Sequence, residues 1–179
     1  MKGKAKYNWL ALAAAFLLLS GSGFAQSALT TALRHIEQTR AAYKLTPADI
    51  SDYVITDQYT SKNNGITHLY LRQRHNGIEV ADANININID REGNVINMGN
   101  RFIPNLRAAI KGNAPGIAPE QAAKAAAAHL KLEVKEPLVV KERKKPTDKL
   151  PAAAKAVVLS DGGISLSPIP AKLIYQPNP

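Results

Sequence analysis

The chain has 179 residues, a formal net charge of +9 at pH 7 and no cysteine. The lack of cysteine excludes disulfide bonds and thiolate catalysis within these residues, so packing and sheet hydrogen bonds must stabilise the fold. The length suits one domain of ordinary size or two small ones, with a modest apolar core.

We expect residues 1–25 to be a secretory signal peptide. A basic start with three lysines precedes an apolar run over residues 9–19, and small residues follow up to a cleavage point after Ala25. The apolar run is shorter than the roughly 20 residues that a bilayer crossing needs, so we expect no membrane association after cleavage; the alternative is an uncleaved anchor. The mature part has a net charge of +6, from 20 basic and 14 acidic residues.

The first mature segment predicts a helix followed by strands. Residues 27–44 place Leu29, Leu33, Ile36 and Tyr43 near one helical stripe, and residues 46–49 predict a short helical turn. The pattern then changes to the alternation that is typical of strands. The predicted strands are residues 53–60, 66–75, 78–89 and 94–102.

Turn signals and alternation predict how these strands pair. The Asn76-Gly77 dipeptide favours a tight hairpin because a type I′ turn needs positive φ at both central residues, and Gly93 closes the next turn. In the third strand Ile85, Ile87 and Ile89 alternate with asparagines, so one face is dry and the other polar. The fold class is therefore α+β: an antiparallel β-meander packed on an N-terminal helix, followed by a smaller helix-plus-strands unit.

The smaller unit follows a linker at residues 106–117. An alanine-rich helix is predicted over residues 119–132, and a charged stretch with three prolines follows over residues 134–151. Residues 156–160 and 164–166 flank Asp161-Gly162-Gly163 and predict a hairpin, and residues 172–175 predict one more strand. We expect the chain to be cut short within this second unit.

The sequence predicts no catalytic, cofactor-binding or metal-binding residue and requires no cofactor. There is no H-E-x-x-H or G-x-S-x-G motif. The histidines are not paired at metal-ligand spacing; they are His35, His68, His75 and His129. The basic run at residues 141–145 is interpreted as a solvated linker rather than a contact to nucleic acid, because no aromatic residue interleaves its charges.

What remains is a binding surface on the polar side of the meander. Amides, a ring and a guanidinium group on neighbouring strands suit recognition of a protein or a sugar. The predicted partner-binding residues are Tyr70, Arg72, Gln73, Asn86 and Asn88, and the predicted structural turns are at Asn76, Gly77 and Gly93. The alternative is that the asparagines only solvate a sheet.

Several runs resemble the fungalysin/thermolysin propeptide (FTP) domain, and more narrowly the prosegments of secreted bacterial fungalysin-family zinc metallopeptidases. They are NGITHLYLRQRHNGIEV at 64–80, NINIDREGNV at 86–95 and Gly99-Asn100, with looser likeness at 45–50, 56–60 and 170–177. The alanine-rich helix is similar to the PepSY-type unit that often follows. The resemblance implies an FTP-like domain over residues 26–105 and a PepSY-like, incomplete unit over residues 118–179.

The resemblance also implies a function. Such prosegments inhibit the attached zinc peptidase domain and act as its intramolecular chaperone, so the expected partner is a fungalysin-type peptidase domain, in cis or in trans, and the expected location is extracellular. The zinc-binding motif of the parent metalloendopeptidase is not in this sequence, so its activity is not carried over. The alternatives are a free-standing exported protein-binding module with the same fold and, third, an unrecognised enzyme.

Overall fold

The computed structural model describes residues 27–112, 114–144 and 156–177. The predicted signal peptide lies outside these residues, as do residues 145–155. The first unit consists of α1 (Ala28–Thr39), the 3-10 turns η1 (Arg40–Tyr43) and η2 (Pro47–Ile50), the strands β1 (Tyr53–Thr60), β2 (Thr67–His75), β3 (Ile78–Ile89) and β4 (Val95–Asn100), and the short helix α2 (Leu106–Ala109).

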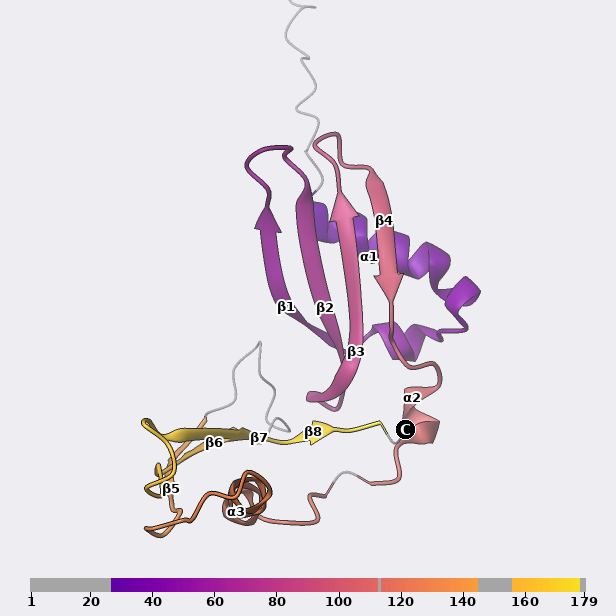
Figure 1. Cartoon of the computed structure of the whole chain (residues 1–179). Coiled ribbons are helices and arrows are strands. Elements are labelled where there is room, and N and C mark those ends of the chain that lie inside the picture. Colours follow the sequence, from indigo (N-terminus) through magenta and orange to yellow (C-terminus); the bar gives the residue numbers. More distant parts are fainter. Residues whose placement is uncertain (1–26, 113, 145–155, 178–179) are drawn as a thin grey trace, which may run out of the picture.

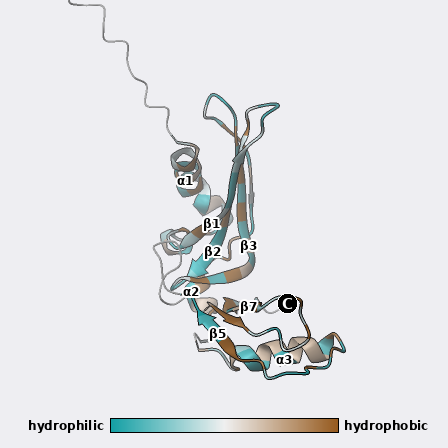
Figure 2. Cartoon of the chain, turned by 90° about the vertical axis from the view of Figure 1, so that its left-hand side faces the viewer, coloured by the Kyte–Doolittle hydropathy of each residue, from teal (hydrophilic) through white to brown (hydrophobic). Residues whose placement is uncertain are grey.

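The first unit is an antiparallel sheet with a helix on one face. The strands lie in the order β1-β2-β3-β4, so the predicted meander is confirmed. Figure 2 shows α1 on one side of the strands, and the buried side chains come from α1 and from alternate positions of β2 and β3. Each fully buried aliphatic side chain contributes about 1.5–3 kcal/mol. The buried cluster is Ala32, Ile36, Leu45, Leu69, Leu71, Ile85, Ile87, Ile89 and Phe102.

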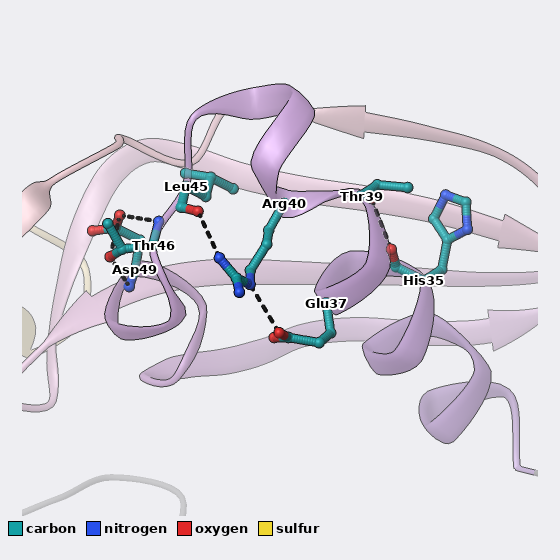
Figure 3. Close-up of polar contacts among 7 residues, drawn as sticks. All are labelled: His35, Glu37, Thr39, Arg40, Leu45, Thr46 and Asp49. Atoms are coloured by element: carbon teal, nitrogen blue, oxygen red, sulfur yellow. Dashed lines mark hydrogen bonds and ion pairs between the residues drawn. The ribbon is translucent and has the colours of Figure 1, made fainter.

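The N-terminal helix is shorter than the sequence predicts. Ser27 is its N-cap, and the helix tightens into a 3-10 turn at Arg40 before Lys44 takes a left-handed φ of 60°. Arg40 fixes this end by donating to Glu37 Oε1 at 2.8 Å and to the Leu45 carbonyl at 3.4 Å (Figure 3). The tighter turn moves Tyr43 off the helical stripe on which the sequence pattern placed it, and Tyr43 is 40% exposed.

The second unit consists of α3 (Pro119–His129), β5 (Val140–Arg143), β6 (Ala156–Leu159) and β7 (Ile169–Lys172). The three strands form an antiparallel sheet in the order β5-β6-β7, and α3 packs against β6 and β7. Ala127, Val157 and Leu159 are its buried side chains. Small alanines on α3 let the helix approach the sheet closely.

Several expectations for this region are wrong. Residues 106–109 of the predicted linker form α2, and Leu106 is buried. Residues 164–166 are not a strand, because Gly162 and Gly163 turn the chain with positive φ and the partner of β6 begins only at Ile169. Residues 141–143 of the basic run, predicted to be a solvated linker, belong to β5, which pairs with β6.

The predicted last strand is divided between the two sheets. It splits into the end of β7 and a separate strand, β8 (Ile174–Tyr175), which pairs in parallel with Glu79 and Val80 of β3. The second unit therefore lies next to the β2–β3 hairpin end of the first sheet (Figure 1).

A bulge in β3 makes this pairing possible. The register with β2 moves from Arg72↔Asn84 to Arg74↔Glu79, so β3 has extra residues there, and Asp82 has a φ of 58°. Such a bulge bends the strand and turns it away from its neighbour. The bent part of β3 buries Val80 and Ala83 with Leu106, and Ile103, Ile110 and Tyr175 pack around them.

Candidate functional site

The candidate site is the face of the first sheet that lies opposite α1, called here the outer face. The register aligns polar and aromatic side chains from all four strands in rows across this face. Its side chains include Asp57 and Tyr59 from β1; His68, Tyr70 and Arg72 from β2; Asn84, Asn86 and Asn88 from β3; and Asn97 from β4.

One row is a continuous line of hydrogen bonds across the sheet. The two ring nitrogens of His68 contact Ser61 Oγ at 2.9 Å and Asn88 Oδ1 at 2.7 Å. Asn88 Nδ2 then donates to Asn97 Oδ1 at 2.6 Å. These bonds fix the orientation of each side chain, so the row is a preorganised polar surface.

Aromatic rings cover the β1 side of this row. The rings of Tyr59 and His68 stack with their centroids 4.7 Å apart, and the ring of Tyr70 lies 6.3 Å from that of Tyr59. A side-chain hydrogen bond with Tyr70 raises the pKa of Tyr59, and the charge interactions with Tyr70 and Asp57 act in the same direction. Tyr59 is 47% exposed, so its ring is open to a partner. Such aromatic surfaces commonly anchor protein contacts.

The neighbouring row depends on a glycine. Asn86 pairs with Tyr70 on one side and with Gly99 on the other. A Cβ atom at Gly99 would overlap Asn86 Oδ1, so the amide of Asn86 lies over the backbone of β4 in the space that a larger residue's Cβ atom would take. The glycine therefore keeps this row flat and accessible.

Arg72 links the outer face to the second unit. Its Nε donates to Asn84 Oδ1 at 3.0 Å, and one of its terminal nitrogens lies 3.3 Å from Glu79 Oε2. The other carboxylate oxygen of Glu79 is 2.8 Å from Lys172 Nζ at the end of β7. Glu79 is largely buried, and the two cations compensate its charge.

Four of the five residues predicted to bind a partner, Tyr70, Arg72, Asn86 and Asn88, lie on the outer face. Gln73 does not, and its predicted partner contact is wrong: the residue is fully buried on the opposite face, in line with Leu69 and Leu71. Its position an even number of residues from these leucines was the signal for burial. The sequence prediction also missed Tyr59 and His68, which the strand pairing brings beside Tyr70.

Gln73 has a structural role together with Asp49. Its amide donates to the carbonyls of Asp49 and Ile103, and its oxygen accepts from the Ile103 N–H at 2.8 Å. Burial alone would raise the pKa of Asp49, but hydrogen bonds from Thr46, Asn105 and Leu106 outweigh it and lower that pKa. Figure 3 shows the hydrogen bonds between Thr46 and Asp49. These contacts hold η2, β2 and the start of α2 together.

The turns predicted as structural have the expected backbone. Asn76 and Gly77 have φ values of 50° and 76°, which suit a type I′ turn, and Gly93 has a φ of 85°. The Gly77 N–H also donates to Asp52 Oδ2 at 2.9 Å, which ties the β2–β3 hairpin to the segment before β1.

Across residues 27–112, 114–144 and 156–177, no three histidine, aspartate or glutamate side chains gather as a metal ion would require. In the same residues, no helix has the length and apolar character needed to cross a membrane.

The sheet that carries this surface matches a known family. Residues 51–102 match the model described as Fungalysin/Thermolysin Propeptide Motif. This segment is an FTP motif. The motif runs from just before β1 to just after β4, so it contains the four strands of the outer face, whereas α1 and the second unit lie outside the match.

Three curated relatives of the chain are fungal proteins. Over 68 residues it is 35% identical to the extracellular metalloproteinase mep of Aspergillus terreus, a match that covers 38% of this chain and 11% of that protein. Over 49 residues it is 43% identical to an extracellular metalloproteinase of Pyrenophora tritici-repentis, covering 27% and 7%. Extracellular metalloproteinase 3 of Trichophyton equinum is 41% identical over 49 residues, covering 27% and 8%.

These matches cover only about a tenth of the relatives' length. The matches named here are 49 to 68 residues long, and the 179 residues contain no H-E-x-x-H sequence, so the catalytic zinc domain is absent from these residues. The relatives named here are fungal, and the narrower resemblance to bacterial members stays an expectation.

Proposed function

We propose that this chain is the propeptide region of a secreted zinc metallopeptidase precursor, and that it binds the peptidase domain, inhibits it and assists its folding. The observation that supports this most directly is the FTP motif at residues 51–102, shared with proteins named extracellular metalloproteinases. The proposal includes export by the N-terminal signal and, for the second unit, a PepSY-like role beside the FTP motif.

The outer face is the surface through which the FTP motif would bind. Its side chains are held by hydrogen bonds before a partner arrives, so little side-chain entropy is lost on binding. It combines the exposed ring of Tyr59 with amides and leaves the opposite face to α1 and the core. This division suits a partner protein that docks on one side of the sheet.

A folding role is compatible with the same contacts. Secreted proteases depend on kinetic stability, and a high unfolding barrier also slows folding unless a template lowers it. A propeptide tethered to its peptidase has a high effective concentration, so a contact surface of modest affinity is enough for inhibition.

The test is inhibition in trans. Residues 26–179 are titrated against a panel of extracellular metalloproteinases that includes those of Aspergillus terreus and Pyrenophora tritici-repentis, with hydrolysis of a fluorogenic peptide as the readout. We expect inhibition of at least one member. If the folded chain inhibits none at high micromolar concentration, the proposal is refuted and the free-standing binding module becomes the better account.

A matched pair of tyrosines tests the surface. Tyr59 is 47% exposed on the outer face, and Tyr43 is 40% exposed beside α1. Tyr59→Ser is expected to weaken inhibition about ten-fold, since aromatic residues dominate such contacts, whereas Tyr43→Ser leaves it unchanged. Equal effects of the two substitutions would place the contact elsewhere.

A further inference from the structure

One extended segment, residues 169–175, belongs to both sheets and is called here the bridging segment. Its first part is β7, which pairs with β6 in the second sheet, and its last part is β8, which pairs with Glu79 and Val80 of β3 in the first sheet. Figure 1 shows β7 continuing into β8 beneath the end of the first sheet. Docking of the second unit on the FTP motif therefore involves a parallel pairing of only 2 residues and the side chains around it.

Apolar and charged contacts accompany this pairing. Tyr175 packs against the buried cluster that includes Val80 and Leu106. Lys172 Nζ, at the end of β7, lies 2.8 Å from Glu79 Oε1, and the Glu79 side chain is only 11% exposed. A carboxylate with so little access to water needs cations to compensate its charge, so Lys172 stabilises docking through Glu79.

Glu79 is shared with a residue of the outer face. Its other carboxylate oxygen lies 3.3 Å from a terminal nitrogen of Arg72, whose side chain is 35% exposed. Arg72 Nε donates to Asn84 Oδ1 at 3.0 Å, and the second terminal nitrogen of Arg72 has no partner among the described residues. Arg72 thus contacts the junction and the outer face, and it keeps a donor for a further acceptor.

The charges of this group make docking depend on the outer face. While the second unit is docked, one anion lies between two cations, so the group has a net positive charge. Without Lys172 the group is neutral, and Arg72 alone compensates Glu79. A negative charge that pairs with Arg72 from the outer face takes part of that compensation away, so the attraction between Glu79 and Lys172 then stabilises docking more. By linkage, docking in turn makes Arg72 bind such a charge more tightly.

We propose that Arg72, Glu79 and Lys172 couple the outer face to the second unit, so that an acidic group held by Arg72 strengthens the docking of the second unit on the FTP motif. This coupling goes beyond the proposed function, because it concerns the two units of this chain and operates with any carboxylate, whichever molecule carries it. The docked second unit then favours acidic groups over neutral ones at Arg72.

The experiment introduces the carboxylate within the chain itself. Asn84→Asp replaces an amide that already accepts from Arg72 Nε by a carboxylate of nearly the same shape. The control Asn97→Asp makes the same change of charge elsewhere on the outer face, where the amide oxygen accepts from Asn88. Both substitutions are made in residues 26–179.

Hydrogen–deuterium exchange of residues 173–177 measures docking, because these amides exchange when the bridging segment leaves β3. Each rate is taken relative to that of residues 85–89, in the part of β3 that pairs with β2 and β4, so that a general change in the first sheet cancels. We expect Asn84→Asp to slow the exchange about two- to five-fold and Asn97→Asp to leave it unchanged. In Lys172→Met the exchange is faster, and adding Asn84→Asp no longer slows it.

The results decide between coupled and independent units. The proposal is overturned if Asn84→Asp leaves the exchange unchanged, accelerates it, or slows it no more than Asn97→Asp does. An equal slowing in the chain that carries Lys172→Met also overturns it, because the effect would then not pass through Glu79. If Lys172→Met alone abolishes the protection of residues 173–177, the comparison of Asn84→Asp with Asn97→Asp still decides.

Discussion

Replacement of Asp49 by asparagine tests whether one buried carboxylate joins η2 to the start of α2. Oδ2 of Asp49 accepts from Thr46 N, Thr46 Oγ1 and Asn105 N at 2.8, 2.7 and 2.9 Å, and Oδ1 accepts from Leu106 N at 2.9 Å. Asparagine has one side-chain oxygen and a donating NH₂ group. If its oxygen takes the place of Oδ2, asparagine keeps three of these bonds. Its NH₂ group then faces the Leu106 N–H, and two donors cannot form a hydrogen bond.

The expected cost follows from this geometry. The Leu106 N–H is left buried and unpaired, which costs about 1–3 kcal/mol. The three remaining bonds lose the strengthening that the negative charge provides, and part of this loss is offset because asparagine has no charge to bury. We therefore expect Asp49→Asn to lower the free energy of unfolding by about 2–4 kcal/mol.

Urea denaturation at two pH values measures this effect. The pKa of Asp49 is lowered in the folded chain, so its stabilisation is present above the unfolded pKa of about 3.9 and is lost as the pH falls through the lower folded value. The difference between the original chain and Asp49→Asn should therefore be large at pH 7 and shrink below pH 4.

The control is Asp90→Asn in the exposed β3–β4 turn. The Asn94 N–H lowers the pKa of Asp90, as hydrogen bonds do for Asp49. Because the Asp90 carboxylate faces solvent, Asp90→Asn is expected to lower the free energy of unfolding by less than Asp49→Asn does. The reasoning is refuted if Asp49→Asn lowers the free energy of unfolding by no more than Asp90→Asn does, or if its effect is the same at both pH values.

Two further substitutions probe the outer face and the junction. Gly99→Ala should lower the free energy of unfolding by less than about 1 kcal/mol, because the new Cβ atom overlaps only the end of the flexible, exposed Asn86 side chain, which can rotate away; Asn86→Ala in the same chain should remove that cost in a urea titration. Tyr175→Phe should leave the thermal midpoint unchanged or raise it, because the buried hydroxyl has no hydrogen-bond partner within the described residues; a clear drop would show that the hydroxyl is paired.

Local signals in the sequence were enough to predict the first sheet. The Asn76-Gly77 turn and the alternation of Ile85, Ile87 and Ile89 with asparagines determine the strand pairing and the buried face, and both patterns are short-range. The outer face could therefore be predicted in outline. Gln73 was misplaced because its polar character was weighed above its position in the alternation.

The second unit was harder to predict because its pairings are less local. β5 lies in a charged stretch whose composition is typical of a linker. It forms a strand because it pairs with β6, and that pairing is not visible in the local sequence. The Asp161-Gly162-Gly163 signal predicted a tight hairpin, but the Gly162 carbonyl bonds to the backbone of Lys135 and Glu136 and the chain pairs again only at Ile169. β8 has two residues, too few for a period to be visible.

The parallel pairing of β3 with β8 makes the order of synthesis matter. Glu79 and Val80 leave the ribosome long before Ile174 and Tyr175, so the bent end of β3 has an open edge until the last strand arrives. Contacts between such distant residues form late in folding. In a fragment limited to the FTP motif, this edge of β3 would stay unpaired. Such a fragment is expected to self-associate by pairing the open edges of two copies.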